Sequence, residues 1–593
     1  MHTGVVSFTT RPTLRGYGGA VAAGHHLAAQ IGAQVLFEGG NAADAACAMG
    51  FALAVLEPTQ NGLGGEVPIL VWHAAEEKAW CVAGQGPAPA GASIAALGDL
   101  PNGLIPHDGF LPAAVPGALD AWCRLLEHFG TWTFPRVTAP AQALAERGFA
   151  MYPFLQVMLR FVAERFEREW PSSAAIYLPI REIGERQTNP PLARFLGAMG
   201  DAARSASSRE AGIRAARDHF YRGRAAEAIE HFLATPIQDA TGHANAGLLC
   251  AQDLAQYEGG LETPIHYDYR GNRVFKAPPW SQGPVFLQHL ALLEGMDLRA
   301  MECRGPDALH TWIETGKLAF ADREACYGDP RHVEVPMDLL LSPAYNAQRR
   351  ALIDPASASL ELRPGQGQLP EGWPRVAAAD AMGTPMEPQA IATAKGRNDT
   401  TQLVATDRQG NVIAATPSGG WLPSSPVIPD LGFPMGTRLQ MAVLDERHPN
   451  ALLPGKRPRT TLSPSLARLA DGRVMAFGTP GGDQQDQWPA LFFHDVVDYG
   501  ETDLQAAIDR PTLHSDHMPS SFYPRQARPG VISAETRIPA ETLAALAARG
   551  HRITRSGDWE HGRVMAVTHR SSDARCEAAA SARGAIAYAA VLP

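Results

Sequence analysis

The order of apolar and polar positions predicts helices packed on a sheet in the first third of the chain. Residues 20–35 have an amphipathic pattern that predicts a helix, and Asn41 is a good N-cap for a second one at 42–56. That second segment is rich in alanine and almost free of polar residues, which is typical of a buried helix. Short apolar runs at 67–72 and 79–83 follow a glycine-rich turn and predict two strands.

The middle of the chain is mainly helical between about residues 138 and 260. Its charged positions alternate in sign at helical spacing, as expected of solvated helix faces with i,i+4 pairs. Strands resume after this insert and precede two long apolar helices. The helices expected in the insert are 139–147, 154–168, 191–199, 208–218 and 223–234; the later strands are 262–269 and 273–277, and the later helices 284–293 and 308–322.

A polar segment rich in proline and glycine, from about residue 354 to 399, separates the helical part from a β-rich part. It has no clear period and is interpreted as a mobile linker. After it the composition shifts toward strands. The strands expected there are 401–406, 412–416, 441–444, 465–469, 474–478, 564–568 and 586–591, with helices at 488–499, 503–509 and 540–549.

The first feature after the linker is a hairpin whose turn lies at 407–411 and whose first strand begins with Thr400 and Thr401. One interpretation is an ordinary hairpin, because threonine is common in strands. The other is that Thr400 becomes a new N-terminus after cleavage of the Asp399–Thr400 bond. A free N-terminal threonine can attack through its hydroxyl, and its own α-amino group, with a pKa of about 8, can serve as the base.

Two further segments have the composition of an acyl-transfer site. Gly481 and Gly482 lie between a strand and a helix, where adjacent backbone N–H groups could stabilise an oxyanion, although a plain turn is the alternative. Thr460 and Thr461 place paired hydroxyls beside a strand, in a segment that alone would be an exposed basic loop.

Composition excludes several other classes of protein. The chain has 593 residues, 45% hydrophobic, and a net charge of −10, which disfavours nucleic-acid and anionic-membrane partners. Its seven cysteines form no CxxC pair, and its histidines, including His25, His26, His310, His514 and His517, make no metal or triad motif, so we expect no metal and no cofactor. The glycine turn at 61–65 fits no phosphate-binding pattern. No signal-type or membrane-spanning segment is evident, and we expect a cytoplasmic protein.

Taken together, these motifs and their order resemble the γ-glutamyltransferase (glutathione hydrolase) family of N-terminal-nucleophile hydrolases over nearly the whole chain. The segments that carry the resemblance are Gly39-Gly40-Asn41-Ala42-Ala43-Asp44-Ala45, Asn61-Gly62-Leu63-Gly64-Gly65, Val115-Pro116-Gly117, Tyr221-Arg222-Gly223, Asp268-Tyr269-Arg270-Gly271, Pro278-Pro279, Ala321-Asp322-Arg323 and Gly328-Asp329-Pro330, together with Asp399-Thr400.

The resemblance implies an α+β fold, a four-layer αββα sandwich built from two subunits cut from one precursor. The large subunit would be residues 1–399 and the small one 400–593, the two remaining entwined. The matching positions imply Thr400 as nucleophile and Ser418 as support for its amine. They also imply Gly481 and Gly482 as oxyanion donors, and Thr460 and Thr461 in place of the serine pair that holds the glutamyl carboxylate.

The chain departs from the family at the positions that hold an α-amino acid. Gln85 stands where the family has an arginine, and glutamine cannot grip a carboxylate with two charge-assisted bonds. Gln440 or Met441 stands where the family has an acid, Arg438 has entered the same stretch, and Gly420 replaces an asparagine. Arg438 or Arg459 could instead meet a carboxylate of another donor.

These observations predict a self-cleaving hydrolase that acts on a small-molecule amide through an acyl-enzyme on Thr400, with water or an amine as acceptor. The amide could be γ-glutamyl, but a less polar or carboxylate-only acyl group fits the changed positions better. A non-glutamyl amidohydrolase or acylase on the same scaffold is thus one alternative. An uncleaved pseudoenzyme or binding protein is another.

Overall fold

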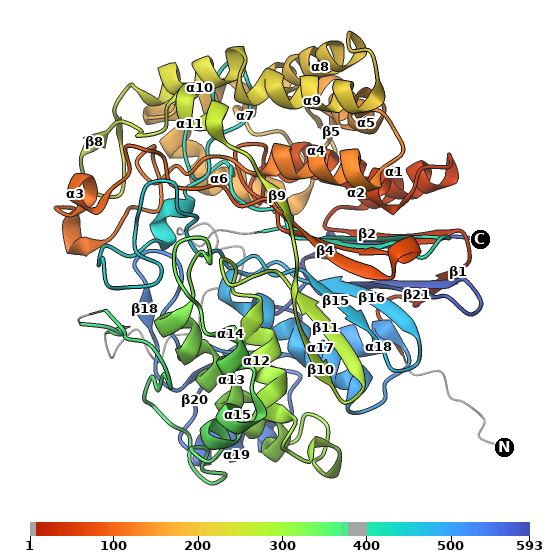
Figure 1. The fold of residues 1–593 in the computed structure, drawn as a ribbon, viewed down its shortest axis with the longest axis vertical. Coiled ribbons are helices and arrows are strands. Elements are labelled where there is room, and N and C mark those ends of the chain that lie inside the picture. The colour runs from red at the N-terminus through yellow and green to blue at the C-terminus, as the bar shows by residue number, and fades with distance from the viewer. Residues whose placement is uncertain (1–7, 371, 378–399) are drawn as a thin grey trace.

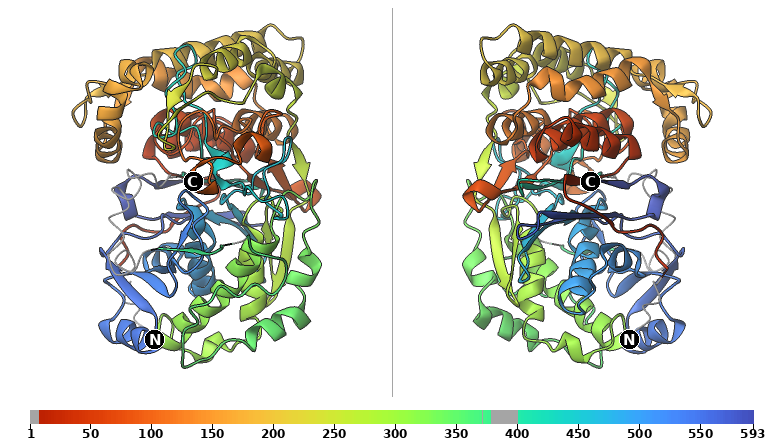
Figure 2. Two further views of the ribbon diagram at one scale, coloured as in Figure 1. Left: turned by 90° about the vertical axis from the view of Figure 1, so that its left-hand side faces the viewer. Right: turned by 90° about the vertical axis from the view of Figure 1, so that its right-hand side faces the viewer.

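Two seven-stranded antiparallel sheets lie face to face in the computed structural model, and helices cover the outer face of each (Figures 1 and 2). The structure describes residues 8–370, 372–377 and 400–593. Asp399 and most of the predicted linker therefore lie outside the described residues.

The first sheet has the strand order β23-β2-β13-β14-β3-β4-β9. Its two central strands, β13 and β14, form the hairpin that follows residue 400, and they pair on either side with strands from the start of the chain. The strands are β2 (Gly19–Ala23), β3 (Ile69–His73), β4 (Lys78–Ala83), β9 (Gly260–Glu262), β13 (Leu403–Asp407), β14 (Val412–Ala415) and β23 (Tyr588–Leu592).

The second sheet has the order β1-β22-β21-β16-β15-β11-β10 and likewise mixes strands from before and after residue 400. Cutting the chain at that point would leave both sheets hydrogen-bonded across the two pieces, so the pieces would stay together. The strands are β1 (Leu14–Gly16), β10 (Ile265–Tyr269), β11 (Asn272–Lys276), β15 (Ser465–Arg468), β16 (Arg473–Gly478), β21 (Met565–Arg570) and β22 (Arg575–Ala580).

Many alanines and valines, with a few larger side chains such as Trp72 and Trp280, fill the space between the sheets. Ala22 and Val404 of the first sheet belong to one buried cluster with Ala476 and Val567 of the second. A layer of such short side chains suits face-to-face packing of two sheets.

A two-tiered set of helices covers the first sheet (Figure 1). The inner tier is α1, α2 and α4. Asn41 is the N-cap of α2, and its side chain accepts from the N–H groups of Ala43 and Asp44. The helical insert forms the outer tier. The bounds are α1 (His26–Phe37), α2 (Ala42–Leu56), α4 (Ala118–Phe129), α5 (Phe134–Arg147), α6 (Pro153–Arg168), α7 (Pro171–Tyr177), α8 (Pro190–Arg204), α9 (Arg209–Tyr221), α10 (Arg224–Leu233) and α11 (Ala251–Gln256).

A second group of helices and a three-stranded sheet, β17-β19-β20, cover the outer face of the second seven-stranded sheet. The helices are α12 (Pro284–Leu293), α13 (Pro306–Cys326), α14 (Met337–Leu340), α15 (Pro343–Arg350), α17 (Trp488–Val497), α18 (Leu504–Asp509) and α19 (Ala540–Ala548), and the strands β17 (Leu513–Ser515), β19 (Val531–Glu535) and β20 (Arg552–Ser556). Short elements elsewhere are α3 (Ile94–Leu97), β5 (Phe149–Ala150), β6 (Arg186–Gln187), β7 (Ile237–Gln238), β8 (Ala244–Asn245), β12 (Arg375–Val376) and β18 (Gln526–Ala527). No helix in the described part of the chain is long and apolar enough to cross a membrane.

The structure corrects three of the expected elements. The helix expected at 20–35 is strand β2 followed by α1, because β2 is buried on both faces and shows no alternation. The strand expected at 262–269 is two strands in different sheets, β9 and β10, with Pro264 in the crossing. The strand expected at 441–444 is absent from the described segment; a 3₁₀ turn, η5 (Arg438–Met441), ends there instead.

The first part of the predicted linker is anchored rather than loose. The carbonyl of Ser359 accepts from Lys317 Nζ at 2.9 Å, and the N–H of Gly365 donates to Asp322 Oδ1 at 2.6 Å. Residues 354–370 thus pack on α13, and the expectation of a mobile segment does not hold for them.

Candidate active site

Thr400 lies at the mouth of the central hairpin and faces Ser418 across it. The two residues form an isolated antiparallel bridge, and Thr400 Oγ1 lies 3.1 Å from Ser418 Oγ. Both side chains are buried. The neighbouring Thr401 donates its N–H to the carbonyl of Pro417 at 3.1 Å, which fixes the start of the strand. The hydroxyl predicted to be the nucleophile is therefore held in a defined position beside a second hydroxyl.

The glycine turn at 61–65 brings an acid to the same place. Glu66 pairs with Ser418 through both backbone bonds, N–H to carbonyl at 2.8 Å in one direction and 3.0 Å in the other. The turn must contain glycine, since a Cβ on Gly65 would lie 2.1 Å from the carbonyl oxygen of Ser418.

Arg438, on η5, completes a chain of three side chains. Its Nε donates to Glu66 Oε1 at 2.5 Å, and its Nη2 donates to Ser418 Oγ at 3.3 Å. Burial raises the pKa of Glu66, and the guanidinium of Arg438 opposes that rise. Arg438 is thus bound to a protein carboxylate, and is not an unpaired cation waiting for a substrate.

Gly481 and Gly482 form the entry to the 3₁₀ turn η6 (Gly482–Asp486). Their φ angles are +128° and +58°, and a Cβ would lie 2.3 Å from Trp488 at the first and 2.8 Å from Phe522 at the second. Only glycine fits both positions, so the backbone of this loop is not screened by side chains of its own.

A buried ionic network holds the glycine loop. Arg323 Nη1 donates to Gln282 Oε1 at 2.7 Å and to Asp483 Oδ1 at 2.6 Å, while Gln282 Nε2 donates to the carbonyl of Gly482 at 3.4 Å. Asp483 also accepts from the N–H and the hydroxyl of Ser521. Because Arg323 and Gln282 precede residue 400 and the loop follows it, this network spans the two parts of the chain.

The residues expected at the positions of an amino-acid clamp are buried and hydrogen-bonded within the chain. Gln85 is 1% exposed, its Nε2 donates to the carbonyl of Gly86 at 3.1 Å, and its Oε1 has no hydrogen-bond partner among the described residues. Gln440 Nε2 donates to Thr437 Oγ1 at 3.0 Å, and Gln440 Oε1 accepts from the N–H of Tyr523 at 3.2 Å. Neither side chain is arranged to bind both charges of a zwitterion.

The Thr460-Thr461 segment is buried, which excludes the exposed basic loop. The backbone of Thr460 bonds to Trp280 and Gln282, and the hydroxyl of Thr461 is buried without a partner in the described part of the chain. Arg459 is 1% exposed, and its guanidinium donates to Glu324 Oε1 at 2.8 Å and to the carbonyl of Arg323. Arg459 is therefore unavailable to a substrate carboxylate, contrary to one of the two options from sequence.

Gly420 lies against backbone rather than open space. Its φ is +60°, and a Cβ would lie 2.9 Å from Gly64 C and Gly65 N. We expect Gly420→Asn to destabilise the protein by roughly 1–3 kcal/mol through this overlap, since asparagine itself tolerates a positive φ. The matched control is Gly472→Asn, at a φ of +84° with nothing within 4 Å of the Cβ. Urea unfolding measures both; equal midpoints would contradict the expected clash.

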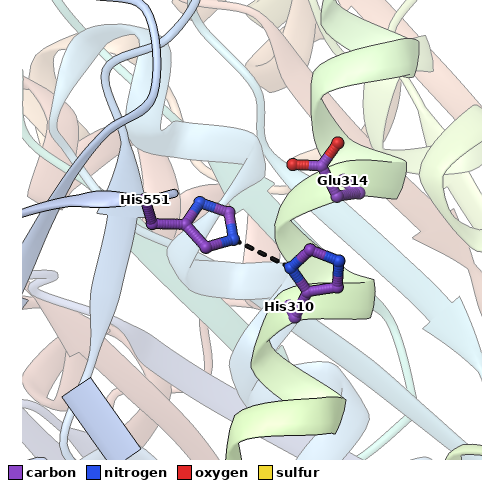
Figure 3. Close-up of side chains that lie close together, drawn as sticks. All are labelled: His310, Glu314 and His551. Atoms are coloured by element: carbon purple, nitrogen blue, oxygen red, sulfur yellow. Dashed lines mark hydrogen bonds between the residues drawn. The ribbon is translucent and has the colours of Figure 1, made fainter. Parts of the chain in front are cut away.

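A second cluster of titratable side chains, His310, Glu314 and His551, links α13 to the segment before β20 (Figure 3). His310 Nε2 contacts the carbonyl of Asp354 at 2.9 Å, so it carries the proton, and His310 Nδ1 accepts from His551 Nε2 at 2.9 Å. Glu314 Oε1 accepts from Lys317 Nζ at 2.6 Å. The cluster is explained by internal hydrogen bonds, and the ammonium beside its carboxylate disfavours a metal cation.

Sequence reasoning missed the residues that support this site. Glu66, Gln282 and Asp483 each follow a glycine- or proline-rich turn whose backbone alone suggests a role, and Arg323 stands out in the sequence only as part of a motif. A charged or amide residue directly after such a turn was the available signal.

Comparison with known proteins gives a consistent result. The family model described as Gamma-glutamyltranspeptidase matches residues 28–591. Two curated relatives are the "Acylase ACY 1 proenzyme" of Pseudomonas sp. (strain SE83), 31% identical over 91% of this chain and 88% of its own, and the "Glutathione hydrolase proenzyme" of Bacillus subtilis (strain 168), 28% identical over 96% and 91%.

Solved structures agree. One named "Structure of LmbA2991HD" is 45% identical with a TM-score of 0.91, covering 99% of this chain and 100% of that one. The cephalosporin acylase from Bacillus halodurans is 27% identical with a TM-score of 0.82, covering 100% and 99%. The chain therefore belongs to the γ-glutamyltranspeptidase family of enzymes, whose members among its relatives include glutathione hydrolase and acylase proenzymes.

Proposed function

We propose that this protein is a self-cleaving amide hydrolase that works through an acyl-enzyme on Thr400, and that its acyl donor is not an α-amino acid. The two stacked sheets with outer helices would be the αββα sandwich of N-terminal-nucleophile hydrolases, with residues 1–399 and 400–593 as its two subunits. The strands of both sheets come from both sides of residue 400, which supports this division.

Maturation would begin with attack of Thr400 Oγ on the carbonyl carbon of Asp399. The peptide C–N bond then breaks as the Oγ–C bond forms, which leaves an ester and a free α-amino group on Thr400. Water hydrolyses the ester, returning the hydroxyl and releasing the carboxylate of Asp399. The 3.1 Å contact with Ser418 supports this role, since it holds the attacking oxygen in place.

In each catalytic cycle the new α-amino group would take the proton of the Thr400 hydroxyl as Oγ attacks the amide carbonyl. Backbone N–H groups of Gly481 and Gly482 would stabilise the tetrahedral oxyanion. The protonated amine returns its proton to the leaving nitrogen, and water or an acceptor amine then takes the acyl group from Thr400.

The choice of donor rests on one observation, the ion pair between Arg438 and Glu66. Arg438, the cation that has entered the former clamp, is neutralised by a protein carboxylate, and Gln85 stands where the family has its arginine. A zwitterionic donor would lose charge-assisted contacts of about 1.5–3 kcal/mol each. Relatives named acylases, beside those named glutathione hydrolases, support a donor other than a γ-glutamyl compound.

Three p-nitroanilides that differ by one charged group at a time test this choice. γ-Glutamyl carries the α-amino and α-carboxylate groups, glutaryl lacks the amino group, and butyryl lacks both. We expect kcat/KM for glutaryl or butyryl to exceed that for γ-glutamyl by about tenfold or more, because each lost contact costs that much. A tenfold preference for γ-glutamyl would refute the proposed donor class while leaving the Thr400 mechanism untouched.

A further inference from the structure

Three side-chain contacts connect Glu66 to Thr400 through Arg438 and Ser418. A guanidinium has donors only, so Arg438 Nη2 donates to Ser418 Oγ at 3.3 Å. Ser418 Oγ lies 3.1 Å from Thr400 Oγ1. Once the Thr400 oxygen has lost its own proton it can only accept, and the Ser418 hydroxyl, polarised by Arg438, is placed to donate to it.

Such a relay stabilises negative charge on Thr400 Oγ as its own proton leaves. Each donor in the relay is polarised by the one behind it, and the last is a full positive charge. The same charge, two hydrogen bonds from Thr400, disfavours protonation of a nearby α-amino group and so keeps that base neutral.

Glu66 determines how strongly the positive charge of Arg438 acts on Ser418 and Thr400. It is buried with Arg438, each less than 5% exposed, so water screens the pair little. Two other charged groups lie near this end of the site. The Glu57 carboxylate is close to Gly24, on the side of Thr401, and Arg323 is bonded to Asp483 behind the glycine loop.

We propose that Arg438 is a positioning residue that activates Thr400 through Ser418, with Glu66 as its counter-charge, and is not a substrate-binding residue. This rests on the proposed function, because it assumes that Thr400 is the nucleophile. The proposal explains why an arginine can occupy the stretch where the family has an acid. The guanidinium of Arg438 contacts Ser418, which supports the nucleophile, and it takes no part in binding the acyl donor.

The test compares Arg438→Met with Glu66→Gln, both measured on fully processed protein with the butyryl and glutaryl anilides. Arg438→Met removes the cation, which raises the pKa of the base and moves the acidic limb of the kcat/KM profile to higher pH. Glu66→Gln leaves the cation uncompensated and moves that limb to lower pH. We expect shifts of about one pH unit each, and a fall in kcat of about 10–100-fold for Arg438→Met, which is part of the roughly 10²–10⁴-fold that general-base catalysis contributes.

The double variant Glu66→Gln/Arg438→Met guards against misfolding, since it leaves no unpaired buried charge. Its acidic limb should lie between those of the single variants, and Arg438→Lys should recover part of the lost kcat. If Arg438 bound substrate, Arg438→Met would instead raise KM for the glutaryl anilide alone and leave the pH profile unmoved, which would overturn the relay. Processing of the wild type into two pieces and the loss of activity in Thr400→Ala test the proposed function separately.

Discussion

Thr400→Ala is expected to yield one uncleaved chain of 593 residues without amidase activity. Alanine has no hydroxyl to attack the Asp399 carbonyl and none to carry an acyl group, so maturation and turnover fail together. We expect activity to fall at least about 10³-fold, as when a covalent nucleophile is removed elsewhere. A denaturing gel after prolonged incubation, with mass spectrometry of the bands, measures the processing.

The matched control is Thr401→Ala, one residue along the same strand. A Cβ built on Gly24 would lie 2.1 Å from Thr401 Oγ1, so that hydroxyl points at Gly24. We expect the control to cleave at the same bond and to stay active, and Thr400→Ser to cleave because it keeps a hydroxyl. Cleavage of Thr400→Ala at the Asp399–Thr400 bond would disprove the nucleophile, and a wild type that stays one band would point to the uncleaved pseudoenzyme.

Arg323→Met is expected to cost about 3–5 kcal/mol of unfolding free energy, because it strips a buried cation from two buried acids. Arg323 Nη2 lies 2.6 Å from Glu324 Oε1, and its Nη1 lies 2.6 Å from Asp483 Oδ1. Burial opposes ionisation of Glu324, but Arg459, Arg323 and Arg525 bring its pKa down to about 2. Glu324 is therefore charged at neutral pH; without Arg323 it keeps Arg459 as a partner, while Asp483 loses its arginine and keeps the hydrogen bonds from Ser521.

Chemical denaturation at pH 7 measures this loss, and Arg331→Met is its control. Arg331 lies 2.9 Å from Asp329 but is half exposed, so its removal should cost under about 1 kcal/mol. Since Asp483 anchors the glycine loop, Arg323→Met should also lower kcat more than it raises KM. Equal stability losses in the two variants would show that the network contributes no more than a surface pair.

How far the sequence predicted this fold depended on the range of the interactions involved. Helix α2 was predicted with its bounds because its N-cap and its composition are local signals. Strand β2 was mistaken for part of a helix because a strand buried on both faces has no alternation. The division of residues 262–269 between two sheets has no local signal beyond one proline.

The candidate site shows the same limit. The roles of Thr400 and the glycine pair, and the loss of the family's arginine at Gln85, stay predictions that depend on residue type and order along the chain. The partner of the Arg438 side chain could not be predicted from the sequence. The sequence alone presents it as a cation able to meet a substrate carboxylate; its partner Glu66 is 372 positions away, and only the folded chain brings them together.

The sequence by itself determined the family, the helical insert and the β-rich part after residue 400, and it predicts the chemistry at Thr400, because motifs, periodicity and composition are properties of neighbouring residues. The tertiary structure decided which charges are already paired. A guanidinium's effect on binding and catalysis depends on what lies within about 3 Å of it and on how far water is excluded, and neither quantity is written in the order of the residues.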